Sequence, residues 1–229
     1  MAKVFFWNLK RLGAATEDII QDKIKARTEE NTPDIVFLCE LSTKATFPDP
    51  QNLTYRKESA YQLCYGCYKN SDKSKGILQK YTPIATDGYK SAGYKGGNDF
   101  TDLADRAVAY YGVVDKAHLY TFHAPSRHDD VRAMAFLAAS LNKLHSRAPW
   151  VLIGDFNIDP NLLAKAPVGI NLADLILHTR EATHERGGIL DYVLTNIDKE
   201  SIKLEVRGRF TRELEGLTDH IPILVEWPI

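Results

Sequence analysis

The stretch VLIGDFNIDP, residues 151–160, decides the fold that we expect for this chain. It begins with four mostly apolar residues, and an apolar run of this length between Pro149 and Pro160 predicts a buried strand. Asp155 and Asn157 are two residues apart, so on an extended chain their side chains point the same way. A carboxylate and an amide therefore emerge together where a core strand ends. Because Asp and Asn are also common in plain turns, this stretch alone leaves a functional and a structural interpretation open.

Three other apolar segments, each predicted to be a buried strand, also carry a polar residue at or near their end. A carboxylate that follows an apolar run is costly to bury unless it is paired or binds a metal, which favours a functional role for Glu40 over simple exposure. A single histidine is more often structural, but His123 stands in the same kind of position. The segments and their polar residues are 4–9 with Asn8, 35–38 with Glu40, and 119–122 with His123.

The remaining pattern predicts one domain over residues 1–229. Apolar residues at helical spacing predict helices over residues 16–28 and 131–144. Residues 43–60 are expected to be irregular, and residues 86–105, rich in Gly, Tyr and Lys, suit either a substrate-contacting loop or a plain solvated one. We expect further strands over 61–68, 76–80, 106–115, 189–195, 202–206 and 223–227, a turn over 70–76, and a loop with a short helix over 160–179.

The composition is that of an ordinary globular protein. Hydrophobic residues make up 44% and charged residues 26% of the 229 residues, and the formal net charge is -1. This charge does not indicate a nucleic-acid-binding protein, but a local basic patch is sufficient for one. Arg207, Arg209 and Arg212 form a small basic cluster that could contribute to such a patch.

The cysteines and the N-terminus argue against several other classes of protein. Three cysteines are too few for a disulfide framework. Cys64 and Cys67 have CxxC spacing, but their aromatic neighbours favour a packed strand over a redox or metal site. The first residues lack a basic segment followed by an apolar core, and no apolar run approaches membrane-spanning length. We therefore expect a cytoplasmic protein without a membrane segment.

The polar residues collected in this way suit the hydrolysis of a phosphate ester. Carboxylates supply the hard oxygen ligands that Mg²⁺ or Mn²⁺ prefers, and a histidine beside a carboxylate can act as a base or bind the phosphate. The sequence has neither the HExxH pattern of zinc proteases nor the GxSxG pattern of serine hydrolases. The candidate residues are Asn8, Glu40, Arg106, His123, Asp155, Asn157, Asp191, Asp219 and His220.

With these residues assembled, the chain resembles the endonuclease/exonuclease/phosphatase superfamily, which has the deoxyribonuclease fold. The matching motifs run in the family's order and span nearly the whole chain, and GDFN with a late TDH is specific as a combination. Within the superfamily, GGILDYVLT and FHA are most similar to the bacterial deoxyribonuclease-like branch, including the nuclease subunit of cytolethal distending toxin. The motifs are WNLKR (7–11), DIVFLCE (34–40), FHAPS (122–126), GDFNIDP (154–160), ILDYVL (189–194) and TDHIPI (218–223).

The resemblance implies a fold, an activity and a set of roles. The fold would belong to the α+β class, as a four-layered α/β/β/α sandwich of two mixed β-sheets with helices outside. The protein would be a monomeric phosphodiesterase that uses Mg²⁺ or Mn²⁺ and acts on DNA. Asp155 would orient or deprotonate the attacking water, and Asp191 would orient His220 at the scissile phosphate. The resemblance implies metal binding by Asn8, Glu40 and Asp219, catalysis by His123, Asp155, Asn157, Asp191 and His220, and phosphate binding by Arg106 and Asn157.

Two alternatives stay open on the sequence alone. The near-neutral charge suits a phosphomonoesterase or a hydrolase of small phosphodiesters, such as phosphoinositides or nucleotides, on the same site. A catalytically silent binding module on this fold is the other alternative, but such a module is expected to lack some of these residues. The chain also departs from deoxyribonucleases, which carry a glutamate that supports the first histidine, because Lys and Gly stand within residues 74–78 instead.

Overall fold

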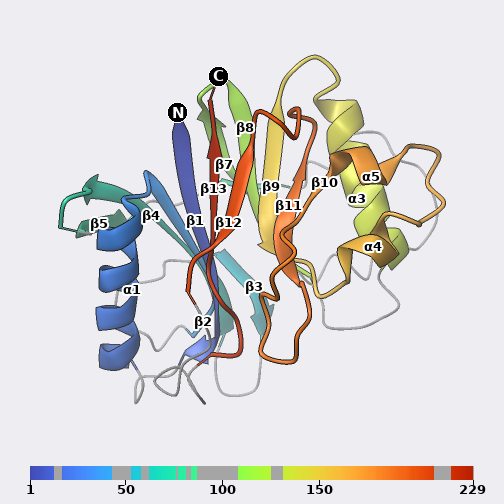
Figure 1. The fold of residues 1–229 in the computed structure, drawn as a ribbon. Coiled ribbons are helices and arrows are strands. Elements are labelled where there is room, and N and C mark those ends of the chain that lie inside the picture. The colour runs from blue at the N-terminus through green and yellow to red at the C-terminus, as the bar shows by residue number, and fades with distance from the viewer. Residues whose placement is uncertain are drawn as a thin grey trace.

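The computed structural model describes residues 1–12, 17–42, 53–57, 62–75, 77–80, 84–86, 108–124, 131–208 and 218–228. In these parts of the chain, two β-sheets pack face to face between two layers of helices. Helix α1 (Glu17–Asn31) lies outside the first sheet, and helices α3 (Val131–Leu144), α4 (Pro160–Leu163) and α5 (Leu172–Leu175) lie outside the second (Figure 1). The predicted four-layered α/β/β/α sandwich is confirmed.

Both sheets mix parallel and antiparallel pairs. Two central pairs, β1 with β2 and β8 with β9, are parallel, and the other described pairs are antiparallel. The first sheet has the order β12 (Lys203–Val206), β13 (Ile223–Trp227), β1 (Ala2–Leu12), β2 (Ile35–Ser42), β4 (Gln62–Asp72) and β3 (Leu53–Lys57), with β5 (Ile77–Lys80) also paired to β4. The second has the order β10 (Ile176–Leu177), β11 (Asp191–Thr195), β9 (Trp150–Asp155), β8 (Ala117–His123), β7 (Val108–Val114) and β6 (Ile84–Thr86).

The central strands are apolar on both faces because both faces are covered. In β1, Val4 and Phe6 pack in one buried cluster with Val151 of the second sheet, so they face the space between the sheets. Phe5 and Trp7 belong to a different buried cluster on the opposite face of the first sheet. Side chains alternate between the faces of a strand, so burial on both faces requires a continuous apolar run.

The polar residues predicted at strand ends lie at one end of the two sheets. Asp155 at the end of β9 is in register with His123 on parallel β8 and with Asp191 on antiparallel β11. In the first sheet, Asn8 of β1 is in register with Cys39 of β2, the residue before Glu40. The carboxyl ends of parallel strands are a common location for binding sites in mixed sheets.

Gly154 lets β8 and β9 approach closely just before this end of the sheet. A Cβ atom at residue 154 would lie 2.0 Å from the carbonyl oxygen of Phe122 and 2.9 Å from its carbonyl carbon. Both are backbone atoms of β8, which cannot rotate away as a side chain could. Gly154 therefore sets the spacing between the strands that carry His123 and Asp155.

Three short strands were not expected from the sequence, and all three lie at sheet edges. Strand β3 falls within residues 43–60, β10 falls within residues 160–179, and β6 had no predicted counterpart. Edge strands are short and only partly covered, so they lack the apolar run by which a buried strand is recognised. Strand β4 also continues to Asp72, into the turn expected over 70–76, whereas α3 has the predicted bounds.

Other expectations concern the cysteines and the membrane. Cys39 and Cys67 are buried, and burial raises the pKa of the Cys67 thiol well above its ordinary value. The side chain of Cys64 lies outside the described residues, so the CxxC pair stays untested. None of the described helices is long and apolar enough to span a membrane.

Candidate active site

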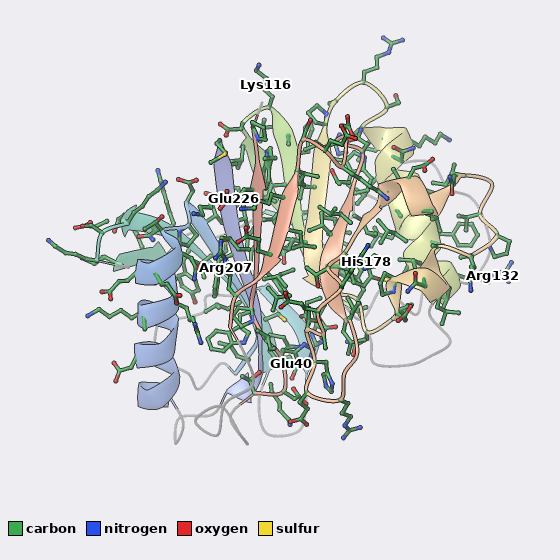
Figure 2. All side chains as sticks on the ribbon, in the orientation of Figure 1. Glu40, Lys116, Arg132, His178, Arg207 and Glu226 are labelled. Carbon is green, nitrogen blue, oxygen red and sulfur yellow. The ribbon has the colours of Figure 1, made fainter. Side chains whose placement is uncertain are left out.

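Strands from both sheets bring candidate residues together where the parallel strands end. Glu40 marks this end, and Lys116 in the turn between β7 and β8 lies at the opposite end of the molecule (Figure 2). The described residues that meet here are Asn8 from β1, Glu40 from β2, His123 from β8, Asp155 from β9, Asn157 after β9, Asp191 from β11, and Asp219 and His220 before β13.

Two side-chain nitrogen atoms, Asn8 Nδ2 and His123 Nε2, lie between the carboxylates of Glu40 and Asp155. Asn8 Nδ2 donates to Asp155 Oδ2 at 2.8 Å and lies 3.4 Å from Glu40 Oε1. His123 Nε2 lies 3.4 Å from each of the same two oxygens. His123 thus has carboxylate neighbours, although residues 74–78 lack the glutamate that supports this histidine in deoxyribonucleases. The Asp155 side chain is 1% exposed and that of Glu40 is 18% exposed, so Glu40 is the carboxylate of the pair that a ligand can reach.

Asn8 turns its amide nitrogen, and not its oxygen, toward the two carboxylates. Its Oδ1 accepts a hydrogen bond from the backbone N–H of Lys10 at 2.9 Å, which distinguishes the two ends of the amide. This orientation suits a residue that holds Glu40 and Asp155 together. Metal ligation by Asn8, which the resemblance implied, would use the oxygen that already bonds to Lys10.

Asp155 is a carboxyl group that titrates near neutral pH. Its pKa is raised to about 7, mainly by burial. The positive charge of His220 opposes this rise, and the negative charge of Asp191 contributes to it. Hydrogen bonds from Asn8 and from the backbone N–H of Asn157 act in the opposite direction. A group with such a pKa can both accept and release a proton at pH 7.

His220 is held as a charged imidazolium by Asp191. Its Nδ1 lies 2.8 Å from Asp191 Oδ2. Burial alone would lower the pKa of His220, but the carboxylates of Asp191 and Asp155 raise it to about 10. The second ring nitrogen, Nε2, lies 3.7 Å from Asp155 Oδ2 and 3.7 Å from Asp219 Oδ1. His220 therefore presents a positively charged N–H donor between two carboxylates.

Hydrogen bonds tie this histidine to the first strand of the chain. The Thr218 hydroxyl donates to the Asn8 carbonyl oxygen at 2.8 Å and accepts from the backbone N–H of His220 at 3.1 Å. The indole Nε1 of Trp7 donates to the His220 carbonyl oxygen at 2.9 Å. Hydrogen bonds therefore connect β1 directly to the segment that carries His220.

Asn157 is fixed beside Asp155 by two hydrogen bonds. Its backbone N–H donates to Asp155 Oδ1 at 2.9 Å, and its Nδ2 donates to the Ala124 carbonyl oxygen at 2.9 Å. The expectation that the two side chains point the same way on an extended chain is wrong, because β9 ends at Asp155 and Asn157 lies in a bend with a φ angle of 52°.

Asp219 lies on the other side of His220 and has two nitrogen-bearing neighbours that were not selected from the sequence. Lys10 Nζ lies 3.0 Å from Asp219 Oδ2, and His184 Nε2 lies 3.5 Å from the same oxygen. Burial opposes ionisation of Asp219, but the hydrogen bond from Lys10 and the charge of His220 lower its pKa. Lys10 stands inside the WNLKR motif, which was the available signal. His184 forms an isolated β-bridge with His220, just before a turn, where no strand-end pattern marks it.

Three residues of the site have a left-handed backbone. The φ angle is 46° at Lys10, 56° at Glu40 and 52° at Asn157. Such a conformation costs of order 1–3 kcal/mol for a residue other than glycine, and it persists where the surrounding structure enforces it. The other described non-glycine residues with positive φ are Thr32, after α1, and Asp115 and Lys116, in the β7–β8 turn.

Part of the expected substrate-binding surface lies outside the described residues. This holds for Arg106, for residues 87–105 of the predicted loop, and for Arg209 and Arg212. Arg207, the described member of the basic cluster, follows β12 and pairs with Glu205.

The oxygen donors suit a hard divalent cation. Carboxylates and amides are the ligands that Mg²⁺ and Mn²⁺ prefer. Asp191 Oδ1 is buried and has no hydrogen-bond partner among the described residues. The potential ligand atoms of His184, Asp219 and His220 lie within 4.8 Å of one another, as do those of Asp155, Asp191 and His220. A protonated His220 is not available as a ligand in either set, which leaves the carboxylates.

The two-sheet sandwich and this cluster of carboxylates and histidines define a hydrolase of phosphate esters. The chain belongs to the endonuclease/exonuclease/phosphatase family, whose model matches residues 6–220. The activities in the family's name share one reaction, the hydrolysis of a phosphate ester.

Several solved structures have the same fold. CdtB, the biologically active subunit of cytolethal distending toxin, is 17% identical with a TM-score of 0.59, and the match covers 99% of this chain and 97% of that chain. An AP endonuclease from Archaeoglobus fulgidus is 14% identical with a TM-score of 0.59, covering 100% of both chains. TDP2 from D. rerio, humanised by 14 mutations, is 14% identical with a TM-score of 0.63, covering 98% of this chain and 97% of that chain. No curated protein matches the sequence.

Proposed function

We propose that the chain is a divalent-metal-dependent phosphodiesterase that hydrolyses DNA by in-line attack of water. The observation that carries this proposal is the pairing of Asp155 with His220. A buried carboxyl group whose pKa is about 7 lies 3.7 Å from an imidazolium that Asp191 keeps charged. These two groups match the two needs of phosphate ester hydrolysis, which are removal of a proton from water and stabilisation of charge on the phosphate.

The roles of the other residues follow from their contacts. In the proposed reaction, Asp155 accepts the proton of the attacking water and His220 donates its Nε2–H to a phosphate oxygen. His123, between Glu40 and Asp155, approaches the phosphate from the other side. The Asn157 amide donates one N–H to the Ala124 carbonyl oxygen and keeps its second N–H for a phosphate oxygen.

We assign the divalent metal, Mg²⁺ or Mn²⁺, to Glu40. Glu40 would hold the ion, which would supply polarisation of the phosphoryl oxygen and offset the charge that develops on the phosphate. Asn8 holds the Glu40 carboxylate close to Asp155 through its amide nitrogen. The partial exposure of Glu40 supports this assignment, because an ion has to reach its ligand from solvent.

Two observations support DNA as the substrate. The motifs GGILDYVLT and FHA are most similar to the deoxyribonuclease-like branch of the family. One of the structures with the same fold is an endonuclease by name.

Nicking of supercoiled plasmid DNA tests this proposal. We expect nicking with Mg²⁺ or Mn²⁺ and none with a chelator. Asp155→Ala and His220→Ala should each lower the rate by at least about 100-fold, because each removes a group that acts on a proton or on charge in the reaction. Glu29→Gln on the exposed surface of α1 is the matched control and should keep the full rate.

The alternative substrate is a small phosphate ester, which the net charge of -1 favours slightly. Metal-dependent release of phosphate from nucleotides or phosphoinositides, without plasmid nicking, would show that the substrate is such an ester and not DNA. Unchanged nicking in Asp155→Ala would contradict the role of Asp155 itself. DNA binding without turnover in any divalent metal would support a silent binding module.

A further inference from the structure

Lys10 has an unusual backbone conformation inside a central strand. Its φ angle is 46°, and the register between β1 and β2 shifts between Asn8 and Leu12, so β1 bulges here. No chain reversal explains this conformation, because β1 continues beyond Lys10 to Leu12. Bulges re-aim side chains, and strained residues of this kind cluster at functional sites. Glu40 and Asn157, which we place in the site, have the same left-handed conformation.

The bulge brings the ammonium group of Lys10 to the active site. Lys10 Nζ lies 3.0 Å from Asp219 Oδ2, and Asp219 Oδ1 lies 3.7 Å from His220 Nε2. One carboxylate therefore separates this ammonium from the imidazolium that we assign to the phosphate. An ammonium has three N–H donors, and the pair with Asp219 uses one of them. The Lys10 side chain is 44% exposed, so an incoming anion can reach it.

Asp219 is surrounded by donors on both of its oxygens. Lys10 and His184 lie beside Oδ2, and His220 lies beside Oδ1. His184 Nδ1 accepts the backbone N–H of Arg186 at 3.1 Å, so the neutral ring carries its proton on Nε2, toward Asp219. A divalent ion bound through Asp219 Oδ2 would have to displace Lys10, and one bound through Oδ1 would lie against the positively charged ring of His220.

We infer that Lys10 binds the substrate phosphate, that Asp219 holds its ammonium group in position, and that Asp219 therefore does not bind the divalent metal already assigned to Glu40. This inference rests on the proposed phosphodiesterase function and adds a cation to the same site. The recognised chemistry is an anionic phosphate ester, which DNA and small esters share. A lysine is suited to this role because its ammonium acts as a point charge toward phosphate.

Binding of a fluorescent DNA duplex in the presence of a chelator tests Lys10 without requiring turnover. We expect Lys10→Gln to weaken binding at low salt by about 10- to 100-fold, the usual effect of losing a hydrogen bond to a charged group. The slope of log K against log salt should also fall by about one, because one phosphate contact is lost. Lys10→Arg should retain most of the affinity and the wild-type slope.

Lys116→Gln is the matched control, because it removes the same charge from the opposite end of the molecule (Figure 2). If Lys10→Gln and Lys116→Gln have equal affinities and equal salt slopes, Lys10 does not bind phosphate. A wild-type chain that binds no DNA would contradict the DNA substrate instead. Titration with inorganic phosphate would then decide on Lys10, and equal dissociation constants for wild type and Lys10→Gln would overturn its assignment.

Manganese binding, measured by electron paramagnetic resonance of free Mn²⁺, tests the metal assignment independently of activity. We expect one ion per chain in the wild type and in Asp219→Asn. In Glu40→Gln the affinity should fall at least about tenfold, as for the loss of an essential metal ligand. Glu29→Gln should bind as the wild type does. Two ions in the wild type, or loss of binding in Asp219→Asn, would overturn the assignment of the metal to Glu40 alone.

Discussion

Asp191 determines both the orientation and the charge of His220. The 2.8 Å contact to Nδ1 directs Nε2 toward Asp155 and Asp219, and the carboxylate keeps the ring protonated. The Asp191 carboxylate also raises the pKa of Asp155. One residue that need not touch the substrate therefore affects both groups on which the proposed reaction depends.

The pH dependence of kcat/KM should report this pair of groups. Asp155 acts as a carboxylate, so activity should rise with pH through about 7, and His220 acts as an imidazolium, so activity should fall with pH through about 10. A divalent ion at Glu40 moves the acid limb to lower pH, since a nearby positive charge favours the carboxylate. Coupled groups titrate together, so both limbs belong to the pair. A profile that is flat from pH 6 to pH 10 would contradict these roles.

The variant Asp191→Asn tests whether the Asp191 carboxylate sets the pKa of His220 and thereby the pH dependence of kcat/KM. Loss of the carboxylate should lower the pKa of His220, because Asp191 is the main group that raises it. Both limbs of the profile should move to lower pH, and kcat/KM at pH 7.5 should fall by about 10²- to 10⁴-fold. Titration of the His220 ring by NMR checks the first effect directly. An unchanged pKa would contradict the assigned role of Asp191.

At the scale of the elements, the spacing of β8 and β9 depends on Gly154. Gly154→Ala would place a Cβ atom 2.0 Å from the Phe122 carbonyl oxygen, so the two strands would have to separate. We expect a loss of about 1–3 kcal/mol or more in the free energy of unfolding, the usual cost of overpacking a core. We also expect a loss of activity, because His123 and Asp155 end these strands.

Urea unfolding of Gly154→Ala beside Gly188→Ala checks this expectation. Gly188 lies in the turn before β11, and its nearest neighbouring atom would be 3.6 Å from an added Cβ, an ordinary contact distance. The Gly188 variant should therefore unfold at the same urea concentration as the wild type. Equal stability of both variants would show that β8 and β9 can separate at no cost.

A second feature at this scale is a cluster of rings where α3 ends against β7 and β8. His145 Nε2 lies 2.6 Å from the Tyr120 hydroxyl, and the His145 ring stacks on His118 with centroids 4.0 Å apart. Burial, and then the charge of His118, lower the pKa of His145 to about 4. Burial also lowers the pKa of His118. This part of the fold therefore requires neutral rings.

The sign of the resulting pH effect on stability follows from His145. Its pKa is about 4 in the folded protein and about 6.5 in the unfolded chain, so between these values the unfolded state binds more protons. Stability should fall as pH decreases from 6.5 to 4, by about 1–3 kcal/mol after allowance for solvent screening. Thermal unfolding of wild type and His145→Gln at pH 7 and pH 4.5 measures this, and the variant should lose less. An equal loss in both would contradict it.

The same elements show what could be predicted from the sequence and what could not. Burial on both faces forces an apolar run, so β1, β2, β8 and β9 were recognisable, and the polar residues that follow them were candidates for the site. Short edge strands carry no such signal. Lys10 and His184 were missed because a bulge and an isolated β-bridge position them against Asp219, which lies more than 30 residues beyond either of them in the sequence.

For the whole molecule, the main feature is the pairing of the first and last strands. β1 and β13 are antiparallel neighbours, with Ala2 opposite Trp227, and the two ends of the chain lie at the same end of the molecule (Figure 1). β1 and β13 occupy adjacent positions inside the first sheet, with β12 beyond β13. The chain therefore closes on itself through hydrogen bonds of the backbone.

A circular permutant should consequently keep the fold. Residues 229 and 1 would be joined by a short Gly-Ser linker, and the chain opened between Glu200 and Ser201, in an exposed turn before β12. We expect kcat/KM within about a factor of ten of the wild type, because termini and exposed turns tolerate such changes. A control opened between Leu152 and Ile153, inside buried β9, should not fold. Equal behaviour of the two permutants would contradict the proposed importance of β9.

The bonds between Thr218 and Asn8, and between Trp7 and His220, join segments more than 200 residues apart. A ribosome synthesises the segment that contains Trp7 and Asn8 more than 200 residues before the segment that contains Thr218 and His220. A nascent chain that stops short of residue 220 carries Glu40, His123 and Asp155 but lacks His220. From the proposed role of His220, we expect hydrolysis of phosphate esters only after residues 218–220 have left the exit tunnel, so products truncated before residue 220 should be inert.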